Sequence, residues 1–308
     1  MPDHALLTAL YTLTPTHCGT GQAMAAVDLP IVREQHTRLP LVPATSLKGV
    51  ARDLWGPDER VAEVLFGPKV ESGRQLHAGA LVLHDGQLLA FPARSLNRPF
   101  VHVTSHLLIE RFARLLRALG LSAPPELRHP DEEGRALVAD AALARGPLVV
   151  EDLIYESEQV LYEPSVGELA RWLACLLPED EPQTRRWLER GLVLLPDMDL
   201  CDLVERATPV QARVKLTAGK TTDKYLPPDG GKLEKGNLWY EETLPPDCLF
   251  GVLVERRAQH RGNGDQLGLF AQKLREKRTV QIGGNETVGQ GRCLWHAVSL
   301  NSWAEASS

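Results

Sequence analysis

Hydrophobic positions along the chain switch repeatedly between alternation, typical of strands, and a period near 3.6 residues, typical of helices. The predicted strands are Leu6–Leu13, Gly79–His84, Gln87–Ala93, Phe100–Val103, Leu148–Tyr155, Leu192–Leu195, Cys248–Val254 and Cys293–Val298. The predicted helices are the stretch that follows Ser46, Val61–Phe66, the stretch from Ser105 to Leu119, Val166–Leu177, Pro182–Glu189, Met198–Ala207 and Gln266–Lys277. Short strands interleaved with helices in this irregular order predict an α+β fold of ferredoxin-like type with large insertions.

Three stretches add detail to this pattern. Asp85-Gly86 is a typical two-residue turn and predicts that the strands on either side of it form a hairpin. Val210–Leu216 and Leu238–Thr243 flank a polar tip rich in Gly and Lys, which predicts a long β-hairpin arm. The stretch Leu121–Gly146 is acidic, rich in Pro and weakly patterned, so we expect a peripheral insertion rather than part of the core.

Composition indicates a globular protein that works in a reducing compartment. The hydrophobic fraction of 43% is ordinary, and no apolar run approaches the roughly 20 residues of a membrane span. The N-terminal stretch lacks a basic region followed by a cleavage site, so we expect no signal peptide. The five cysteines are scattered, which predicts free thiols and a cytoplasmic location.

The net charge of −6 is distributed unevenly along the chain. Glu126–Glu163 holds ten acids and three bases, so the rest of the chain is close to neutral. Arg94–Arg117 has five bases and one acid, while Arg206–Lys235 and Glu255–Arg278 each have seven bases and three acids. Such basic stretches are typical of a protein that binds RNA on one side, although solvated surface charge gives the same pattern.

The loop after the first predicted strand holds the candidate catalytic group. Asp28 follows four small or apolar residues and precedes Leu29-Pro30. A carboxylate in this position could bind a divalent cation or orient an attacking ribose hydroxyl, and it could equally cap the loop. His17 lies in the same loop and could assist or simply form a hydrogen bond.

Two further stretches are candidates for contacting phosphate. Ser46 is a suitable N-cap, which places Lys48 in the first helical turn, where exposed N–H groups attract anions. The alternative for Lys48 is a solvated side chain. The stretch VQIGGNETVGQG holds Gly283, Gly284, Gly289 and Gly291, which allow close approach to a phosphate or to another chain segment. It lacks the Lys-Ser/Thr pair of a Walker loop, and a tight turn between strands remains the alternative.

Several motifs, taken in chain order, together resemble a known family. They are LYTLTPTHCGTG, AVDLPIVREQHTRLP, VPATSLKGVARD, LLAFPARSL, LVLLPDMD, NLWYEETLPP and VQIGGNETVGQG. These motifs resemble the backbone subunits of type III-B CRISPR (Cmr) effector complexes, which belong to the repeat-associated mysterious protein (RAMP) superfamily. The resemblance implies one RAMP domain over residues 1–308, with a ferredoxin-like (RRM-like) palm, helical insertions and a β-hairpin thumb over residues 211–242.

The resemblance also implies an activity and its partners. Copies of such a subunit stack into a helical filament along the CRISPR guide RNA, with other Cmr subunits and no membrane. The complex cleaves complementary target RNA at regular intervals in a reaction that requires a divalent metal, magnesium or manganese. The matching catalytic and metal-binding position is Asp28, with His17 as a possible second catalytic group. The RNA-binding positions implied are Ser46, Lys48, Arg52, Gly283, Gly284, Gly289, Gly291, Lys220 and Lys224.

Two alternatives to the nuclease remain open. The first is a scaffold subunit that binds guide RNA in the same kind of complex and does not cut. The second is a nucleotide-binding enzyme that uses the glycine-rich loop, which the missing Lys-Ser/Thr pair disfavours.

Overall fold

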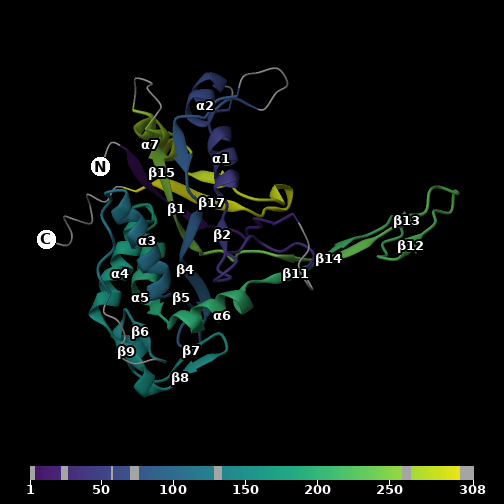
Figure 1. Ribbon diagram of the computed structural model, residues 1–308. Coiled ribbons are helices and arrows are strands. Elements are labelled where there is room, and N and C mark those ends of the chain that lie inside the picture. Colours follow the sequence, from purple (N-terminus) through teal and green to yellow (C-terminus); the bar gives the residue numbers. More distant parts are fainter. Residues whose placement is uncertain are drawn as a thin grey trace.

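The computed structural model describes residues 4–21, 27–56, 58–69, 76–127, 134–258 and 265–298. Helices and strands alternate through these residues in a mixed α+β architecture, as the hydrophobic pattern predicts (Figure 1). Within the same residues, no helix is both long enough and apolar enough to span a bilayer.

A mixed sheet of 11 strands runs through the molecule. Strand β1 (Ala5–Thr12) lies between β17 (Arg292–Ala297) and β15 (Leu249–Arg256) and is antiparallel to both. The order then continues through β4 (Gly86–Arg94), β5 (Phe100–Thr104), β10 (Leu192–Leu194), β6 (Ala136–Val138) and β9 (Val160–Tyr162). The remaining members are β16 (Thr279–Gln281) beside β17, β3 (Leu81–Leu83) beside β15 and β2 (Leu41–Val42) beside β4.

Helices cover both faces of this sheet, and β1 is therefore buried along its whole length (Figure 1). Leu6 and Leu10 of β1 pack in one cluster with residues of α1 (Ala44–Asp53), α2 (Glu59–Phe66) and α7 (Gln266–Glu276). Leu7 and Ala9 pack in a second cluster with α3 (His106–Ala118), α4 (Pro164–Cys175) and α5 (Pro182–Gly191). Burial on two faces explains why the first strand alternates only loosely in the sequence.

The prediction of a hairpin at Asp85-Gly86 is wrong. Strands β3 and β4 do not pair with each other, because both lie antiparallel on β15. Between Leu83 and Gln87 the chain advances four residues while β15 advances three, which is the geometry of a bulge. Instead of closing a turn, the Asp85 carboxylate accepts a hydrogen bond from the Ala44 amide, at 2.7 Å, where α1 begins.

The expectation that residues 121–146 lie outside the core is also wrong in part. Strand β6 within this stretch pairs with β10 and β9, and all three of its residues are buried. Leu143, in a short 3-10 helix over Ala141–Ala144, is buried as well. A strand of three residues surrounded by acidic and turn-forming residues is too short to show a period of its own. Residues 128–133 of the stretch lie outside the described part of the chain.

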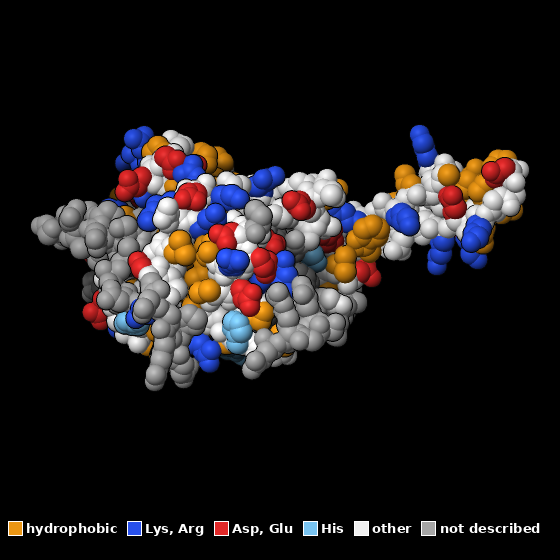
Figure 2. All heavy atoms as spheres, turned by 90° about the horizontal axis from the view of Figure 1, so that it is seen from above, with side chains coloured by type: hydrophobic (Ala, Val, Ile, Leu, Met, Phe, Trp, Pro, Cys, Tyr) orange, Lys and Arg blue, Asp and Glu red, His pale blue; other side chains and the backbone are white. Residues whose placement is uncertain are grey.

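Two hairpins leave the central sheet. The predicted strand Leu148–Tyr155 is split at Glu151, whose φ is +52°, into β7 (Leu148–Val150) and β8 (Leu153–Tyr155). After α6 (Asp197–Ala207), strands β11 (Val210–Lys215) and β14 (Asn237–Glu242) form the predicted long hairpin. The hairpin carries a second short pair, β12 (Lys224–Tyr225) and β13 (Glu234–Lys235), and projects from the body of the molecule (Figures 1 and 2).

Candidate functional site

The loop that follows β1 folds back onto the base of the projecting hairpin. The Leu29 amide donates to the Tyr240 carbonyl at 3.0 Å, and the Glu242 amide donates to the Leu29 carbonyl at 2.9 Å. The Asp28 carboxylate accepts from the Tyr240 amide, at 2.8 Å, through Oδ2, and Asp28 is exposed. Both sequence interpretations of Asp28 are therefore compatible with the structure, since one oxygen caps the loop while the residue faces solvent.

The Glu242 side chain holds the part of the loop that follows Leu29. Its Oε2 accepts from the Ile31 amide at 2.9 Å, and its Oε1 accepts from Arg33 Nη2 at 2.6 Å. The side chains of Arg33 and Glu242 are only 5% and 10% exposed, so this is a buried ion pair. A buried pair in which each oxygen has its own donor holds two segments rigidly, because separating them would leave buried charge without a partner.

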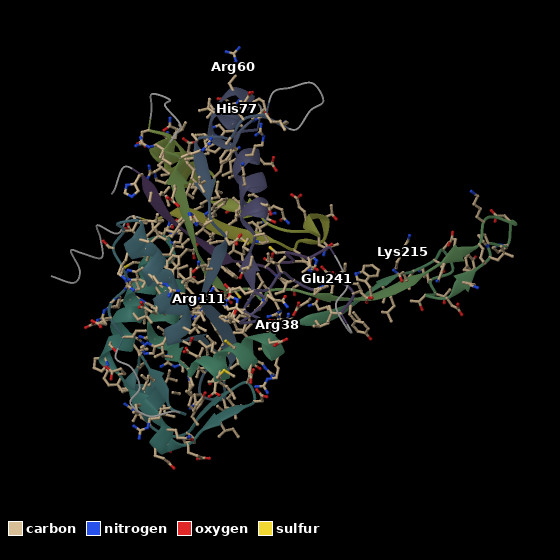
Figure 3. All side chains as sticks on the ribbon, in the orientation of Figure 1. Arg38, Arg60, His77, Arg111, Lys215 and Glu241 are labelled. Carbon is tan, nitrogen blue, oxygen red and sulfur yellow. The ribbon has the colours of Figure 1, made fainter. Side chains whose placement is uncertain are left out.

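Glu241, the neighbouring residue, joins the hairpin to the glycine-rich loop. It is 1% exposed and accepts from Arg213 Nε at 3.0 Å and from the side-chain amide of Asn285. His17 Nδ1 lies 3.9 Å from the same carboxylate. Figure 3 shows Glu241 where the hairpin joins the body of the molecule. Three segments far apart in the sequence therefore meet around one buried carboxylate.

His17 is held tightly in this junction. Its Nδ1 donates to the Glu242 carbonyl at 2.7 Å, and its own carbonyl accepts from the Gly284 amide at 3.0 Å. A side chain at Gly19 would place its Cβ 2.4 Å from His17 Nε2, so the glycine is required for the ring to lie there. These contacts favour the interpretation of His17 as a hydrogen-bonding group that organises the loop.

The four glycines of the glycine-rich loop divide into two pairs. Gly283 has a φ of +79°, and a Cβ there would lie 2.1 Å from the His17 carbonyl oxygen. Gly291 also has a φ of +79°, and its Cβ would lie 2.2 Å from the Ile282 carbonyl oxygen. These two positions require glycine for packing against the chain itself. A Cβ at Gly284 or Gly289 would meet no atom closer than 3.9 Å, so this exposed pair is open to a ligand.

The prediction of Ser46 as the N-cap of α1 is wrong. The helix begins at Ala44 after Pro43, because Asp85 supplies the capping carboxylate from outside the segment. Lys48 is therefore the fifth helical residue rather than a member of the first turn, so the argument from exposed N–H groups does not apply to it. Lys48 is exposed, and it makes no ion pair within the part of the chain that the structure describes. Arg52 instead pairs with Glu59 and donates to the Gly67 carbonyl.

The hairpin presents two different faces. Cross-strand register places Ala212 opposite Tyr240 and Val214 opposite Leu238, so an apolar face runs along the hairpin. Val214 and Leu238 are 48% and 52% exposed. Arg213 and Lys215 belong to the opposite face, and Lys220 and Lys224 are exposed near the tip. In Figure 2, basic and apolar side chains both project from the arm into solvent.

Sequence reasoning missed the buried contacts that support this site. Glu241 and Glu242 end a predicted strand, and two adjacent acids at that position were the available signal. Arg111 of α3 donates to both oxygens of Glu34, at 2.7 and 2.6 Å, and so anchors the turn that follows the Asp28 loop. Arg117 of the same helix pairs with Glu110. Arg111 and Arg117 of α3 are therefore both bound to acids within the chain.

Acidic groups near Asp28 do not by themselves form a metal cage. Among the described residues, no group of three or more His, Cys, Asp and Glu side chains could hold an ion. The carboxylates of Glu241 and Glu242 already accept hydrogen bonds from Arg213 and Arg33. Magnesium is commonly bound through one or two carboxylates together with phosphate oxygens of the substrate. The exposed Asp28 carboxylate fits that mode, in which the nucleic acid completes the ligand set.

Comparisons with known proteins find similarity over nearly the whole chain. A family model described as the RAMP superfamily matches residues 9–293. The "CRISPR system Cmr endoribonuclease Cmr4" of Pyrococcus furiosus is 32% identical over 296 residues, 93% of this chain and 93% of that protein. The crystal structure of oligomeric Cmr4 from Pyrococcus furiosus matches with a TM-score of 0.71 at 26% identity, covering 96% of this chain and 99% of that one. A chain in the cryo-EM structure of the type III-B Cmr-beta complex bound to cognate target RNA shares the fold, with a TM-score of 0.69 at 20% identity, covering 96% of this chain and 98% of that one.

Proposed function

Because the chain belongs to the RAMP superfamily, we propose that it is a backbone subunit of a type III-B CRISPR effector complex that cleaves target RNA complementary to its guide. The observation that carries the proposal is the exposed Asp28 carboxylate, held at the hairpin base by the Tyr240 amide. The relative in Pyrococcus furiosus is named an endoribonuclease, and similarity to it covers 93% of both chains.

The fold supports the architecture expected for such a subunit. Strands β17, β1, β15 and β4 lie in that order and are antiparallel to their neighbours. Helices α1 and α2 fall between β1 and β4 in the chain, and α7 falls between β15 and β17. This order and connectivity supports the proposal of a ferredoxin-like palm. The hairpin of β11 and β14 is the proposed thumb.

The proposed chemistry centres on Asp28. Its Oδ2 is held by the Tyr240 amide, so the carboxylate has a defined direction before RNA binds. An ionised carboxylate in that position can orient the ribose 2′-hydroxyl next to the scissile phosphate and accept its proton. Asp28 is also the residue that would hold a divalent cation, magnesium or manganese, and such an ion would stabilise negative charge on the phosphate. His17, with Nδ1 committed to the Glu242 carbonyl, positions the loop.

The proposed RNA path crosses the same region. Of the predicted guide-binding set, Lys48, Gly283, Gly284 and Gly289 are exposed, and Lys220 and Lys224 are exposed on the proposed thumb. The partners are the guide RNA, the complementary target, further copies of the chain in a filament and other Cmr subunits. Arg52 is less suited to bind guide, because its guanidinium is already engaged by Glu59 and the Gly67 carbonyl.

The test is Asp28→Asn in the reconstituted complex, with Asp202→Asn on an exposed face of α6 as the matched control. We expect the Asp28 variant to bind guide and target as the unaltered complex does and to lose cleavage, while the control cleaves normally. Titration of magnesium and manganese after chelation tests the metal dependence separately. Cleavage by the Asp28 variant at the unaltered rate would leave the non-cutting scaffold as the function.

A further inference from the structure

A small groove lies between helix α5 and the loop that connects β4 to β5. Its volume is about 400 Å³, and its lining includes Arg98, Phe100, Arg186, Trp187 and Arg190. Ligand pockets begin at about 300 Å³, so the groove has the size of a small ligand. The elements that line it are different from those that position Asp28, so this is a second location on the molecule (Figure 1).

One wall of the groove is aromatic and exposed. Trp187 is 47% exposed, whereas Trp172 and Trp295 are completely buried. Phe100 meets Trp187 edge to face, with 6.0 Å between ring centroids and 77° between ring planes. This contact fixes the orientation of the indole while leaving much of its surface in solvent. A rigid, exposed aromatic ring is the usual platform for stacking a nucleic-acid base.

The lining of the groove holds three arginines and no carboxylate. Arg98 donates to Asp140 Oδ2 at 2.7 Å and also to the Arg190 carbonyl, so its guanidinium is held in place. Arg186 and Arg190 make no ion pair within the described part of the chain, and no carboxylate lines the groove. The Asp140 carboxylate, whose pKa is lowered by the Ala142 amide and also by Arg98 and Arg190, offsets part of this positive charge. The three guanidinium groups beside an exposed indole still indicate an anionic, aromatic ligand.

We propose that this groove binds one nucleotide of single-stranded RNA, with the base against Trp187 and the phosphate between Arg186 and Arg190. A small ligand is favoured over a protein partner, because the groove has the volume of a small-ligand site and combines one exposed aromatic ring with arginines. The proposed function enters only as the source of the RNA. The site itself rests on the groove, the exposed ring and the unpaired arginines.

The test measures binding of adenosine 5′-monophosphate to the isolated full-length chain by calorimetry, with adenosine and inorganic phosphate as partial ligands. We expect the nucleotide to bind more tightly than either partial ligand. Trp187→Ala should weaken nucleotide binding by about fivefold to 150-fold, since stacking one base is worth about 1–3 kcal/mol. Trp187→Phe should retain most of it, and Arg186→Ala should remove the advantage of the nucleotide over adenosine.

Arg60→Ala is the matched control, because Arg60 borders an apolar groove between α2 and α7 that holds no aromatic residue (Figure 3). This variant should bind the nucleotide as the unaltered chain does. Equal binding by the unaltered chain and Trp187→Ala would overturn the proposal. So would absence of nucleotide binding together with impaired self-assembly of Trp187→Ala, which would assign the groove to a protein contact. Neither result bears on cleavage, because no guide or target is present.

Discussion

The substitution Glu242→Gln tests whether the hairpin base positions the Asp28 loop. It keeps the size of the side chain and removes the charge opposite Arg33. The Glu242 carboxylate accepts from two donors, Arg33 Nη2 at 2.6 Å and the Ile31 amide at 2.9 Å. A glutamine can accept from only one of them, and its NH₂ group must then face the other donor.

The free energy that Glu242→Gln should cost follows from the burial of the Arg33–Glu242 pair. The Arg33 and Glu242 side chains are 5% and 10% exposed, and breaking a buried pair by altering one partner costs about 3–5 kcal/mol. We expect about 3 kcal/mol, because the loop can open locally and so limit the loss. If the free energy of local loop opening falls by about 3 kcal/mol, amide exchange accelerates about 150-fold, at about 1.36 kcal/mol for each factor of ten.

The assay is hydrogen exchange at the Leu29 amide, which donates to the Tyr240 carbonyl at 3.0 Å rather than to the altered side chain. Cleavage of target RNA by the reconstituted complex should slow in parallel, while target binding is retained. Arg38–Glu205 is the matched exposed pair, with a 3.4 Å separation and side chains 39% and 46% exposed. Glu205→Gln should cost less than about 1 kcal/mol. Equal exchange rates at Leu29 in the two variants would refute the positioning role of Glu242.

Two further predictions concern the neighbouring segments. Gly283→Ala should lower the midpoint of chemical denaturation more than Gly289→Ala does. Both glycines have positive φ, but only at Gly283 would a Cβ meet backbone, 2.1 Å from the His17 carbonyl oxygen. Equal midpoints for the two variants would contradict the close packing at Gly283. For Glu34, burial raises the pKa, but hydrogen bonds from Arg111 and Thr37 outweigh it and hold the pKa below 4.5, the value for an unperturbed glutamate. A lowered folded pKa stabilises the protein above the unfolded value and loses that contribution as pH falls through the folded pKa. The Arg111→Met variant should therefore lose less stability than the unaltered chain as the pH falls from about 5 to about 3, as measured by denaturation titrations. Equal losses in the two proteins would show that the Glu34–Arg111 pair does not contribute to the pH dependence of stability.

The elements with strong periods could be predicted from the sequence. The helix predicted from Ser105 to Leu119 is α3 (His106–Ala118), and the strand Leu6–Leu13 is β1 (Ala5–Thr12). The period of α3 specifies its buried side without reference to the rest of the chain. Strand β1 is buried on both faces, so it could be recognised only as a run of β-forming, mostly apolar residues. The long hairpin was predictable because its two strands flank a polar tip rich in Gly and Lys. Asp28 could be singled out because an isolated carboxylate among apolar residues needs an explanation.

Only the tertiary structure decided which groups meet. Asp85 caps α1 rather than closing a hairpin, and Ala136–Val138 enters the main sheet despite acidic surroundings. Glu242 binds Arg33 across 209 residues of sequence, and His17 lies beside the glycine-rich loop. Local sequence reports how one segment buries its own apolar side. The partner of a buried charge or of an N–H group at a helix start depends on where distant segments pack, and no local pattern carries that information.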